Sequence, residues 1–346
     1  MANWKYAICL LCLLIPGAFA AEPVSTVWIT NQNQAAKNNP QLARIQPEVH
    51  AVNVSDRFVE IQSGGISLHY LGVLQSPADH IERIRQLRFR IPRYPEPAKS
   101  AQASVRSDAM GVFLNGVPIY NQFESTSYRG QNLWHFDPLA WNDDGSLIAA
   151  GHPRATLEHN GSLGVLENLI ADASQHSPII GYAFDGYPIY GPWAYGEDGK
   201  LRRMRSGYRL RQIKRRTYLP DGTELTPAQF GPSVGKDAGT DFPLGSFVED
   251  YEFAAGTGDL DEHNGRFAKT PEYPAGTYAY FLTTDAAGRL AFPYLLAHRY
   301  HGQVSVEQLA EAFRDLANGN SLPSAAPLCH KIVAPVRPNE STLTLE

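Results

Sequence analysis

The chain has 346 residues, a formal net charge of −5 at pH 7 and 3 cysteines. The negative net charge argues against a general binder of polyanions such as nucleic acid. The length is sufficient to bury a large core without disulfides, in one large β domain or in two smaller ones.

The first segment, residues 1–20, has the pattern of a secretory signal peptide. One basic residue, Lys5, precedes an apolar run that ends in Ala-Phe-Ala at 18–20. This order is that of a cleaved export signal, and the run is too short to span a bilayer. We therefore predict cleavage after Ala20 and an exported protein, periplasmic or extracellular, with no membrane span.

Cleavage would change the cysteine count. Cys9 and Cys12 belong to the signal peptide, which leaves Cys329 alone in the mature chain. A single cysteine forms no intrachain disulfide and no thiolate cluster. A metal site would therefore be built from imidazole and carboxylate groups.

The following segments differ in composition. Residues 21–48 are polar and interrupted by proline, which predicts an extended lead-in. From 49 to 302, short alternating apolar runs are separated by Asn-Gly, Asp-Gly, Gly-Gly and proline, and the chain contains 17 tyrosines and 15 phenylalanines. These signals predict a mainly β domain of antiparallel sheets, a sandwich or barrel-like, with long loops. The first hairpin is expected around Gly64-Gly65.

Two helices are expected. Residues 162–175 space leucine and isoleucine with helical periodicity, which predicts a short internal helix. Residues 303–319 predict a C-terminal helix, because Ser305 and Gln308 form a capping box and Gly319 stands where the helix should stop. A proline-containing tail, 320–346, follows.

Residues 201–216 form a basic run with eight Arg or Lys residues. Alternation within "YRLRQIK" favours a strand with one charged, solvated face. A polyanion-binding patch is the less favoured alternative, because the run lacks stacking or groove-reading features.

Two stretches share one layout, "GVFLNGVPIYN" at 111–121 and "GYAFDGYPIYG" at 181–191. Asn-Gly in the first and Asp-Gly in the second predict hairpins with two-residue type I′ turns, in which both central residues need positive φ. If the two hairpins are neighbours, the segment between them arches over one end of the sheet. Asp185 would then approach that segment as a supporting group.

Seven stretches occur in an order that is typical of a known family: "NGVPIYN", "GHP", "SPIIGYAFDGYPIYGP", "SGYRLR", "GDLDEHNGRF", "TPEYPAGTYAYFLT" and "FPY". Over residues 49–302 the chain resembles the YHYH-domain proteins, exported proteins named for a Tyr-His-Tyr-His motif. The resemblance implies export but no established reaction.

The chain departs from this family at the name-giving motif. After "GHP" it has "RATLEHN", in which only His159 stands at a histidine position. Ala149 and His263 occupy positions where many relatives carry cysteine. The resemblance therefore implies that a disulfide of the family is absent here.

The segment between the two repeated stretches carries most of the candidate chemistry. Its imidazole and carboxylate groups belong to His135, Asp137, Asp143, Asp144, His152, Glu158 and His159. Such groups bind copper or zinc when they converge. We expect His152 and His159 as ligands, with His135 or His263 nearby. His135 could equally be a half-buried structural histidine, and Asp143-Asp144 a simple turn.

A second cluster lies in "GDLDEHNGR" at 258–266. Asp259 and Asp261 resemble the oxygen ligands of a calcium loop, but Asn264 and Thr270 occupy positions where an EF-hand needs glycine and glutamate. The EF-hand interpretation therefore fails. A looser metal site that includes His263, with calcium as an alternative to copper or zinc, stays open beside a hydrogen-bonded turn.

Three functions follow from these features. The first is an exported protein that binds a metal through His135, His152, His159, His263, Asp137, Asp185, Asp259 and Asp261. The second is a non-catalytic surface or matrix module that binds a glycan, a protein or a small molecule. The third is a metal-independent hydrolase with acid and base side chains. The sequence leaves open whether the protein is an enzyme.

Overall fold

The structure is a computed structural model of the chain, and it describes residues 22–30, 48–65, 86–102, 109–120, 122–124, 127–137, 171–235 and 241–315. Several predicted features lie outside these residues. They are the signal peptide, most of the internal helix, the C-terminal tail, and the loop residues Asp143, Asp144, His152, Glu158 and His159.

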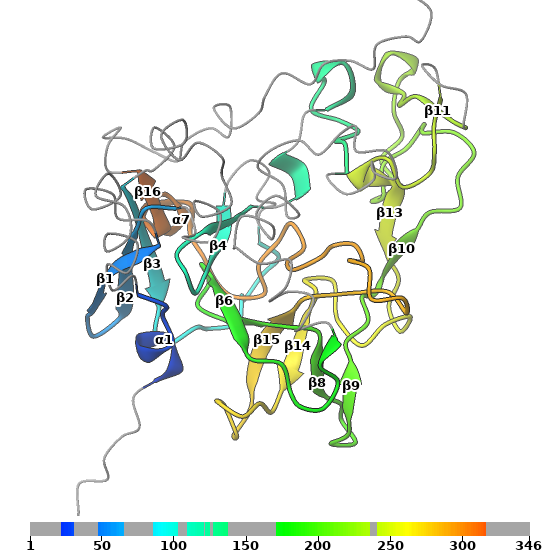
Figure 1. The fold of residues 1–346 in the computed structure, drawn as a ribbon. Coiled ribbons are helices and arrows are strands. Elements are labelled where there is room, and N and C mark those ends of the chain that lie inside the picture. Colours follow the sequence, from blue (N-terminus) through cyan, green and yellow to red (C-terminus); the bar gives the residue numbers. More distant parts are fainter. Residues whose placement is uncertain are drawn as a thin grey trace, which may run out of the picture.

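The described chain is mainly β, as predicted, and its sheets follow one another along the molecule (Figure 1). A four-stranded antiparallel sheet occupies one end in the order β1-β2-β3-β16, and its strands β1 and β2 are blue in the figure. Its strands are β1 (Val49–Val54), β2 (Phe58–Ser63), β3 (Leu87–Pro92) and β16 (Phe313–Asp315). Along β2 and β3 every second residue is buried, which is the pattern of strands with one face on the core.

The β1–β2 hairpin turns at 55–57, not around Gly64-Gly65 as expected. Ser55 Oγ accepts a hydrogen bond from the Phe58 amide at 3.1 Å and closes the turn. The prediction followed the glycine pair because glycine is a frequent marker of turns, whereas this hairpin turns through Ser55, Asp56 and Arg57 without glycine.

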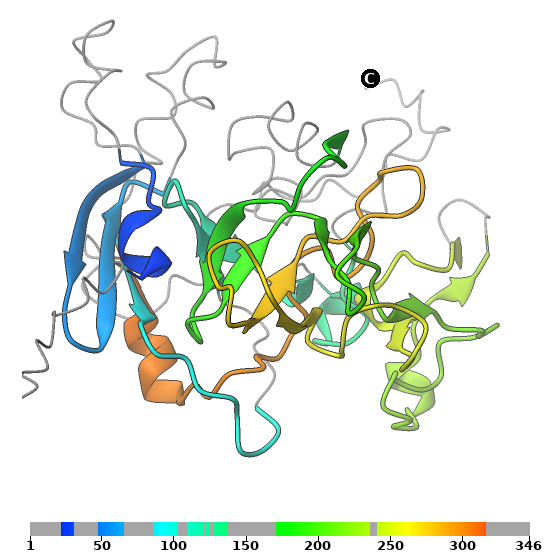
Figure 2. The same ribbon diagram turned by 90° about the horizontal axis from the view of Figure 1, so that it is seen from below.

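A six-stranded sheet forms the middle of the molecule in the order β14-β15-β7-β6-β4-β5 (Figure 2). Its strands are β4 (Ala109–Phe113), β5 (Pro118–Tyr120), β6 (Ile179–Ala183), β7 (Pro188–Tyr190), β14 (Gly265–Ala268) and β15 (Thr277–Phe281). All neighbours are antiparallel except β15 and β7, which are parallel. Both large sheets are open, so neither closes into a barrel.

The two repeated stretches are the hairpins β4–β5 and β6–β7, and they are neighbours through β4 and β6. Their turns are not of the predicted two-residue type. In each, the amide of the glycine bonds back across three residues, Gly116 to Phe113 O at 2.8 Å and Gly186 to Ala183 O at 2.9 Å. Only the glycines have positive φ, +83° and +95°. This is a three-residue turn with glycine in the left-handed position.

The contact between β4 and β6 depends on a glycine in each strand. A Cβ atom on Gly111 would lie 2.6 Å from the Tyr182 carbonyl oxygen, and one on Gly181 would lie 2.6 Å from the Val112 carbonyl oxygen. The same approach occurs on both sides because the pairing is symmetric about Val112 and Tyr182. The repeat in the sequence is therefore a repeat of the strand interface.

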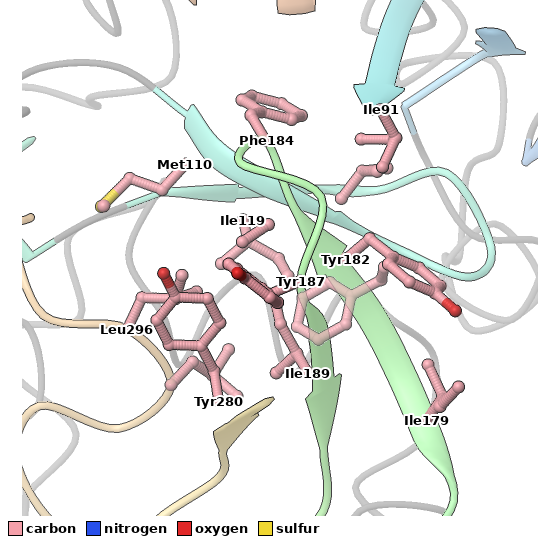
Figure 3. Close-up of a cluster of buried hydrophobic side chains, with 14 of the residues drawn as sticks. Ile91, Met110, Ile119, Ile179, Tyr182, Phe184, Tyr187, Ile189, Tyr280 and Leu296 are labelled. Carbon is pink, nitrogen blue, oxygen red and sulfur yellow. The ribbon is translucent and has the colours of Figure 1, made fainter. Parts of the chain in front are cut away.

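The main core lies between the two large sheets (Figure 3). Phe184, in the β6–β7 turn, stacks on Phe89 of β3 with ring centroids 6.0 Å apart. Tyr280 and Leu296 belong to the same buried cluster as Ile91 of β3. The β6–β7 hairpin thus joins the two sheets and fixes the position of its Asp185-Gly186 turn.

Three small sheets complete the β structure. Two are antiparallel pairs, β8 (Trp193–Tyr195) with β9 (Leu201–Arg203) and β10 (Tyr208–Leu210) with β13 (Tyr251–Phe253). The third is the parallel pair β11 (Ser233–Val234) with β12 (Asp241–Phe242).

Within the basic run at 201–216, the strand expected in "YRLRQIK" (208–214) is present only over Tyr208–Leu210, and its charged side chains are not all solvated. Only 201–203 and 208–210 are strands, and Arg211 and Arg216 are buried, 2% and 1% exposed. Arg216 pairs with Asp250, and both Arg211 and Arg216 donate to backbone carbonyls. Buried carbonyl groups that need donors explain why arginines occur here.

Helices are few. A short helix, α1 (Pro23–Thr26), lies in the lead-in that was expected to be extended, and it precedes the buried Trp28, whose indole donates to Val24 O. Four 3₁₀ turns are η2 (Gln122–Glu124), η3 (Tyr128–Gly130), η4 (Pro227–Gln229) and η5 (Val248–Asp250). In the described ranges, no helix is long and apolar enough to cross a membrane.

The C-terminal helix α7 (Val306–Ala312) is shorter than predicted. The capping box is present, with Gln308 N 3.1 Å from Ser305 Oγ and Ser305 N 2.8 Å from Gln308 Oε1. The helix ends at Ala312 because the next three residues pair with β3 as β16. Tertiary strand pairing therefore overrides the helical periodicity of the sequence.

Candidate functional site

An open groove of about 630 Å³ lies beside the edge strand β14. One wall is the segment after β3, and the other is formed by β14 and the start of β15. The lining residues are Arg93, Tyr94, Pro95, Pro97, Tyr187, Asp261, Phe267, Gly276, Thr277, Tyr278 and His301. We call this feature the aromatic groove.

Two aromatic side chains of the groove are largely in solvent. Tyr94 is 62% exposed and Phe267 is 65% exposed. They come from different walls, Tyr94 from the segment after β3 and Phe267 from β14. Large aromatic side chains exposed beside a groove are typical of a binding surface.

Between the walls, a stacked pair of rings lines the groove. The imidazole of His301 lies parallel to the Tyr278 ring, with centroids 3.5 Å apart and an interplanar angle of 4°. Tyr187 meets both rings edge to face, at 5.3 Å from Tyr278 and 5.6 Å from His301. Burial lowers the pKa of His301, and the charge of Asp261 offsets only part of this effect. The neutral imidazole is therefore favoured near pH 7.

Asp261 is the carboxylate of the groove. Both of its oxygens accept from the Tyr278 hydroxyl at 2.9 Å, and Oδ1 also accepts from the amides of His263 and Gly265. The same residues form a tight turn, in which the Asn264 amide bonds to Asp261 O. Asn264 has a positive φ of 65° and is fully buried. The calcium-like pattern in the sequence is thus a hydrogen-bonded turn that holds the Tyr278 hydroxyl.

His263 lies next to this turn. Its Nδ1 is 3.1 Å from the Arg299 carbonyl oxygen, which only accepts, so Nδ1 carries the proton. Nε2 is 3.6 Å from Glu262 Oε1, and the His263 ring lies 5.7 Å from the His301 ring. The two imidazoles are therefore neighbours at one side of the groove.

Asp185 lies behind the groove, only 1% exposed. Its Oδ2 accepts from the Tyr280 hydroxyl at 2.6 Å and from the Gly302 amide at 2.9 Å, and its Oδ1 accepts from the Tyr187 amide at 3.2 Å. Burial raises the pKa of Asp185 to about 6, against the lowering effect of these donors. A carboxyl group in this environment titrates within a mildly acidic range.

His135 and Asp137 are engaged with other partners. His135 Nδ1 is 2.6 Å from Glu249 Oε1 and its Nε2 is 3.0 Å from Asn132 Oδ1, so both ring nitrogens are occupied. Asp137 is buried and accepts from the Tyr294 hydroxyl at 2.6 and 2.7 Å. His135 is thus buried rather than half-buried, and its ring is bonded to side chains.

Asp259 is also paired. Its carboxylate lies 3.0 Å from Arg205 Nε and 3.5 Å from Arg202 Nη2. Burial, the largest single contribution, raises the pKa of Asp259, but the interactions with the two arginines together lower it below its ordinary value. The carboxylate thus connects the loop before β14 to β9 and the residues that follow it.

Of the eight predicted ligand residues, the structure brings three to the groove or directly behind it: Asp185, Asp261 and His263. His135, Asp137 and Asp259 have separate partners, and His152 and His159 lie outside the described residues. Within the described ranges, no three His, Cys, Asp or Glu side chains lie together as a metal site.

Sequence reasoning missed His301 and the tyrosines around it. The alternation Tyr278-x-Tyr280 in "GTYAYF" places both side chains on one face of β15, and this could have been predicted from the sequence. Nothing in the sequence indicates that His301, more than a hundred residues after Asp185, is joined to it.

Comparison with known proteins gives one match. A family model described as YHYH protein covers residues 88–291, which is more than half of the chain. No curated relative and no solved structure matches the chain.

Proposed function

The chain belongs to the YHYH protein family, and from this membership and the geometry of the aromatic groove we propose that it is an exported, non-catalytic module that binds a glycan segment. The observation that carries the proposal is the pair of exposed rings, Tyr94 and Phe267, on the two walls of an open groove of about 630 Å³.

Sugar rings fit the chemistry of this groove. One face of a pyranose is a set of C–H groups that packs on an aromatic ring, and its hydroxyls need hydrogen-bonding groups at the edges. Tyr94 and Phe267 offer ring faces, while Asp261, Thr277 and His301 offer polar groups in the same lining.

The charges of the groove favour a neutral ligand. Arg93 is its cation, and it makes two hydrogen bonds to the Glu22 carboxylate, at 2.7 and 2.9 Å. Asp261 adds a negative charge at the lining. An anionic ligand would therefore be repelled by the Asp261 carboxylate and would find the Arg93 guanidinium already paired. Neither effect applies to a neutral sugar.

A proline-rich peptide is the competing occupant, because aromatic-lined grooves also bind polyproline II segments. Such a peptide requires only ring faces and a few hydrogen-bond partners. The glycan is favoured because the aromatic groove includes a carboxylate, and paired sugar hydroxyls can donate to it.

The test is binding of the mature protein to a panel of neutral oligosaccharides and to a polyproline peptide, followed by calorimetry with any ligand found. Tyr94→Ala and Phe267→Ala are each expected to weaken glycan affinity by about tenfold or more. Tyr218→Ala is the control, because Tyr218 is 40% exposed and lines no part of the groove. Binding of the peptide alone, or equal loss in all three variants, would contradict the glycan proposal.

Binding of copper or zinc is a second candidate, supported by the neighbouring imidazoles of His263 and His301 at 5.7 Å between ring centroids. The sequence adds His152 and His159 as candidate ligands, and both lie outside the described residues. The test is elemental analysis and calorimetric titration with copper, zinc and calcium. The wild type is compared with His152→Ala/His159→Ala and His263→Ala/His301→Ala.

Uptake of copper or zinc should weaken as pH falls through the histidine range, because neutral imidazole is the binding form. Absence of stoichiometric metal in the wild type would end this candidate.

A further inference from the structure

We infer that Asp185 and Tyr280 are positioning residues that hold His301 against Tyr278 and so set the shape of the aromatic groove. The geometry behind the groove supports this inference, and none of it involves contact between Asp185 and a ligand. Its consequence for ligand binding rests on the proposed function, whereas the position of His301 does not.

The first step is a chain of hydrogen bonds from Asp185 to His301. The Tyr280 hydroxyl donates to Asp185 Oδ2 at 2.6 Å and accepts from the His301 amide at 2.9 Å. The next amide, Gly302 N, donates directly to Asp185 Oδ2 at 2.9 Å. Two consecutive backbone amides of the loop therefore end on the Asp185–Tyr280 pair.

The second step is the closeness of this contact. A Cβ atom on Gly302 would lie 2.7 Å from Asp185 Cβ and 2.8 Å from its Oδ2, so the loop reaches the carboxylate only because residue 302 is glycine. On its other side, the His301 carbonyl accepts from the Ala98 amide at 2.9 Å. The backbone of His301 is thus held from both sides, and its ring is directed onto Tyr278.

The third step concerns the groups that face Asp185. They are Tyr187 from the same hairpin, Tyr278 and Tyr280 from β15, and His263 and His301 from the neighbouring loops. Burial keeps the pKa values of Tyr278 and Tyr280 well above their usual range, so both stay protonated. The Tyr280 hydroxyl therefore keeps its proton and stays the donor to Asp185 while it accepts from the His301 amide.

The experiment follows the imidazole C–H resonances of His301 by NMR at pH 7.5, assigned with His301→Gln. In the wild type, stacking on Tyr278 shields these protons. In Tyr280→Phe and in Asp185→Asn, the shielding should be reduced. Tyr182→Phe is the matched control, because it removes a hydroxyl whose partner is Tyr273, away from His301.

The outcomes separate this inference from the proposed function. Unchanged His301 shielding in folded Tyr280→Phe or Asp185→Asn would overturn the inference. If both variants fail to fold, hydrogen exchange of the wild-type His301 and Gly302 amides decides, because rapid exchange would contradict their bonds to Tyr280 and Asp185. Reduced shielding in the variants of a protein that binds no glycan would refute the proposed function and leave the positioning role intact. Glycan affinity that falls with the shielding would support both.

Discussion

Gly186 shows how much one residue depends on its surroundings. It has a φ of +95°, and a Cβ atom there would lie 2.8 Å from the Pro92 carbonyl oxygen and 3.1 Å from Pro95 Cβ. Gly199 has a similar positive φ of +72° but nothing within 4 Å of the same atom. A comparison of substitutions at the two glycines therefore distinguishes the cost of the left-handed backbone from the cost of a steric clash with the wall of the groove.

Both glycines are testable by substitution. Gly199→Ala should cost about 1 kcal/mol of unfolding free energy, because only the left-handed conformation is penalised. Gly186→Ala should cost clearly more, because Pro92 and Pro95 must also move. Chemical denaturation midpoints measure both, and equal midpoints would show that the contact with the 92–95 segment is easily relaxed.

Asp185 gives a prediction with a defined sign. The pKa of its carboxyl is raised from 3.8 to about 6 in the folded protein, so the folded state holds the proton more tightly than the unfolded state between these values. The contribution of Asp185 to stability is thus present below about pH 4 and is lost as pH rises to about 6. The difference corresponds to about 3 kcal/mol.

Substitution isolates this contribution from other titrating groups. Relative to the wild type, Asp185→Asn should gain about 3 kcal/mol of unfolding free energy between pH 4 and pH 7, because asparagine does not ionise. The measurement is urea unfolding of both proteins across that range. A difference that stays constant with pH would mean that the buried carboxyl titrates at its ordinary pKa.

At the scale of one element, α7 depends on its first turn. The reciprocal bonds between Ser305 and Gln308 satisfy two amide groups of the helix start. Ser305→Ala should lower the unfolding free energy by about 1 kcal/mol, while Ser305→Asp should retain most of it. Thermal unfolding compares the three proteins. Equal loss in both variants would indicate that packing, rather than the cap, starts the helix.

Strand elements show a similar dependence on context. Phe313–Asp315 continues the helical pattern of the sequence, yet it pairs with β3 as β16. α7 is further joined to β3 by the ion pair of Arg90 with Glu311. Because the free edge of β3 offers unpaired backbone groups, strand pairing there stabilises these residues more than another helical turn does.

At the scale of the molecule, the part that contains β10 to β13 is organised around a buried charge. Arg216 is completely buried, holds Asp250 through two bonds of 2.8 Å and donates to Pro232 O and Pro243 O. Its guanidinium also lies over the Phe247 ring at 4.8 Å. Trp134 and Phe247 are buried in this part and lie outside the main hydrophobic cluster between the two sheets.

Removal of this charge should therefore act locally. Arg216→Met leaves Asp250 buried without its cation and should cost about 3–5 kcal/mol in this part of the molecule. Hydrogen exchange is expected to accelerate at residues 205–250, whereas amides of β6 and β15 stay protected. Uniform acceleration across all strands would show that the two parts unfold as one cooperative unit.

The sequence by itself determined the mainly β class, the two hairpins of the repeated stretches and the capping box at Ser305. Each depends on the local spacing of apolar, turn and capping residues, so a short stretch of sequence is sufficient to indicate it. The turn type was wrong because type I′ and three-residue turns share the same Asn-Gly or Asp-Gly signal, and only the backbone path distinguishes them. Family membership also followed from local stretches.

Only the tertiary structure decided the site. Asp185 and Asp261 were candidates from their residue type, but their partners Tyr278, Tyr280 and Gly302 lie 17 to 117 residues away. The buried arginines, 211 and 216, were indistinguishable in sequence from solvated ones. Burial, pKa and stacking are properties of groups that the fold brings together across long sequence separations, so the local spacing of residues does not indicate them.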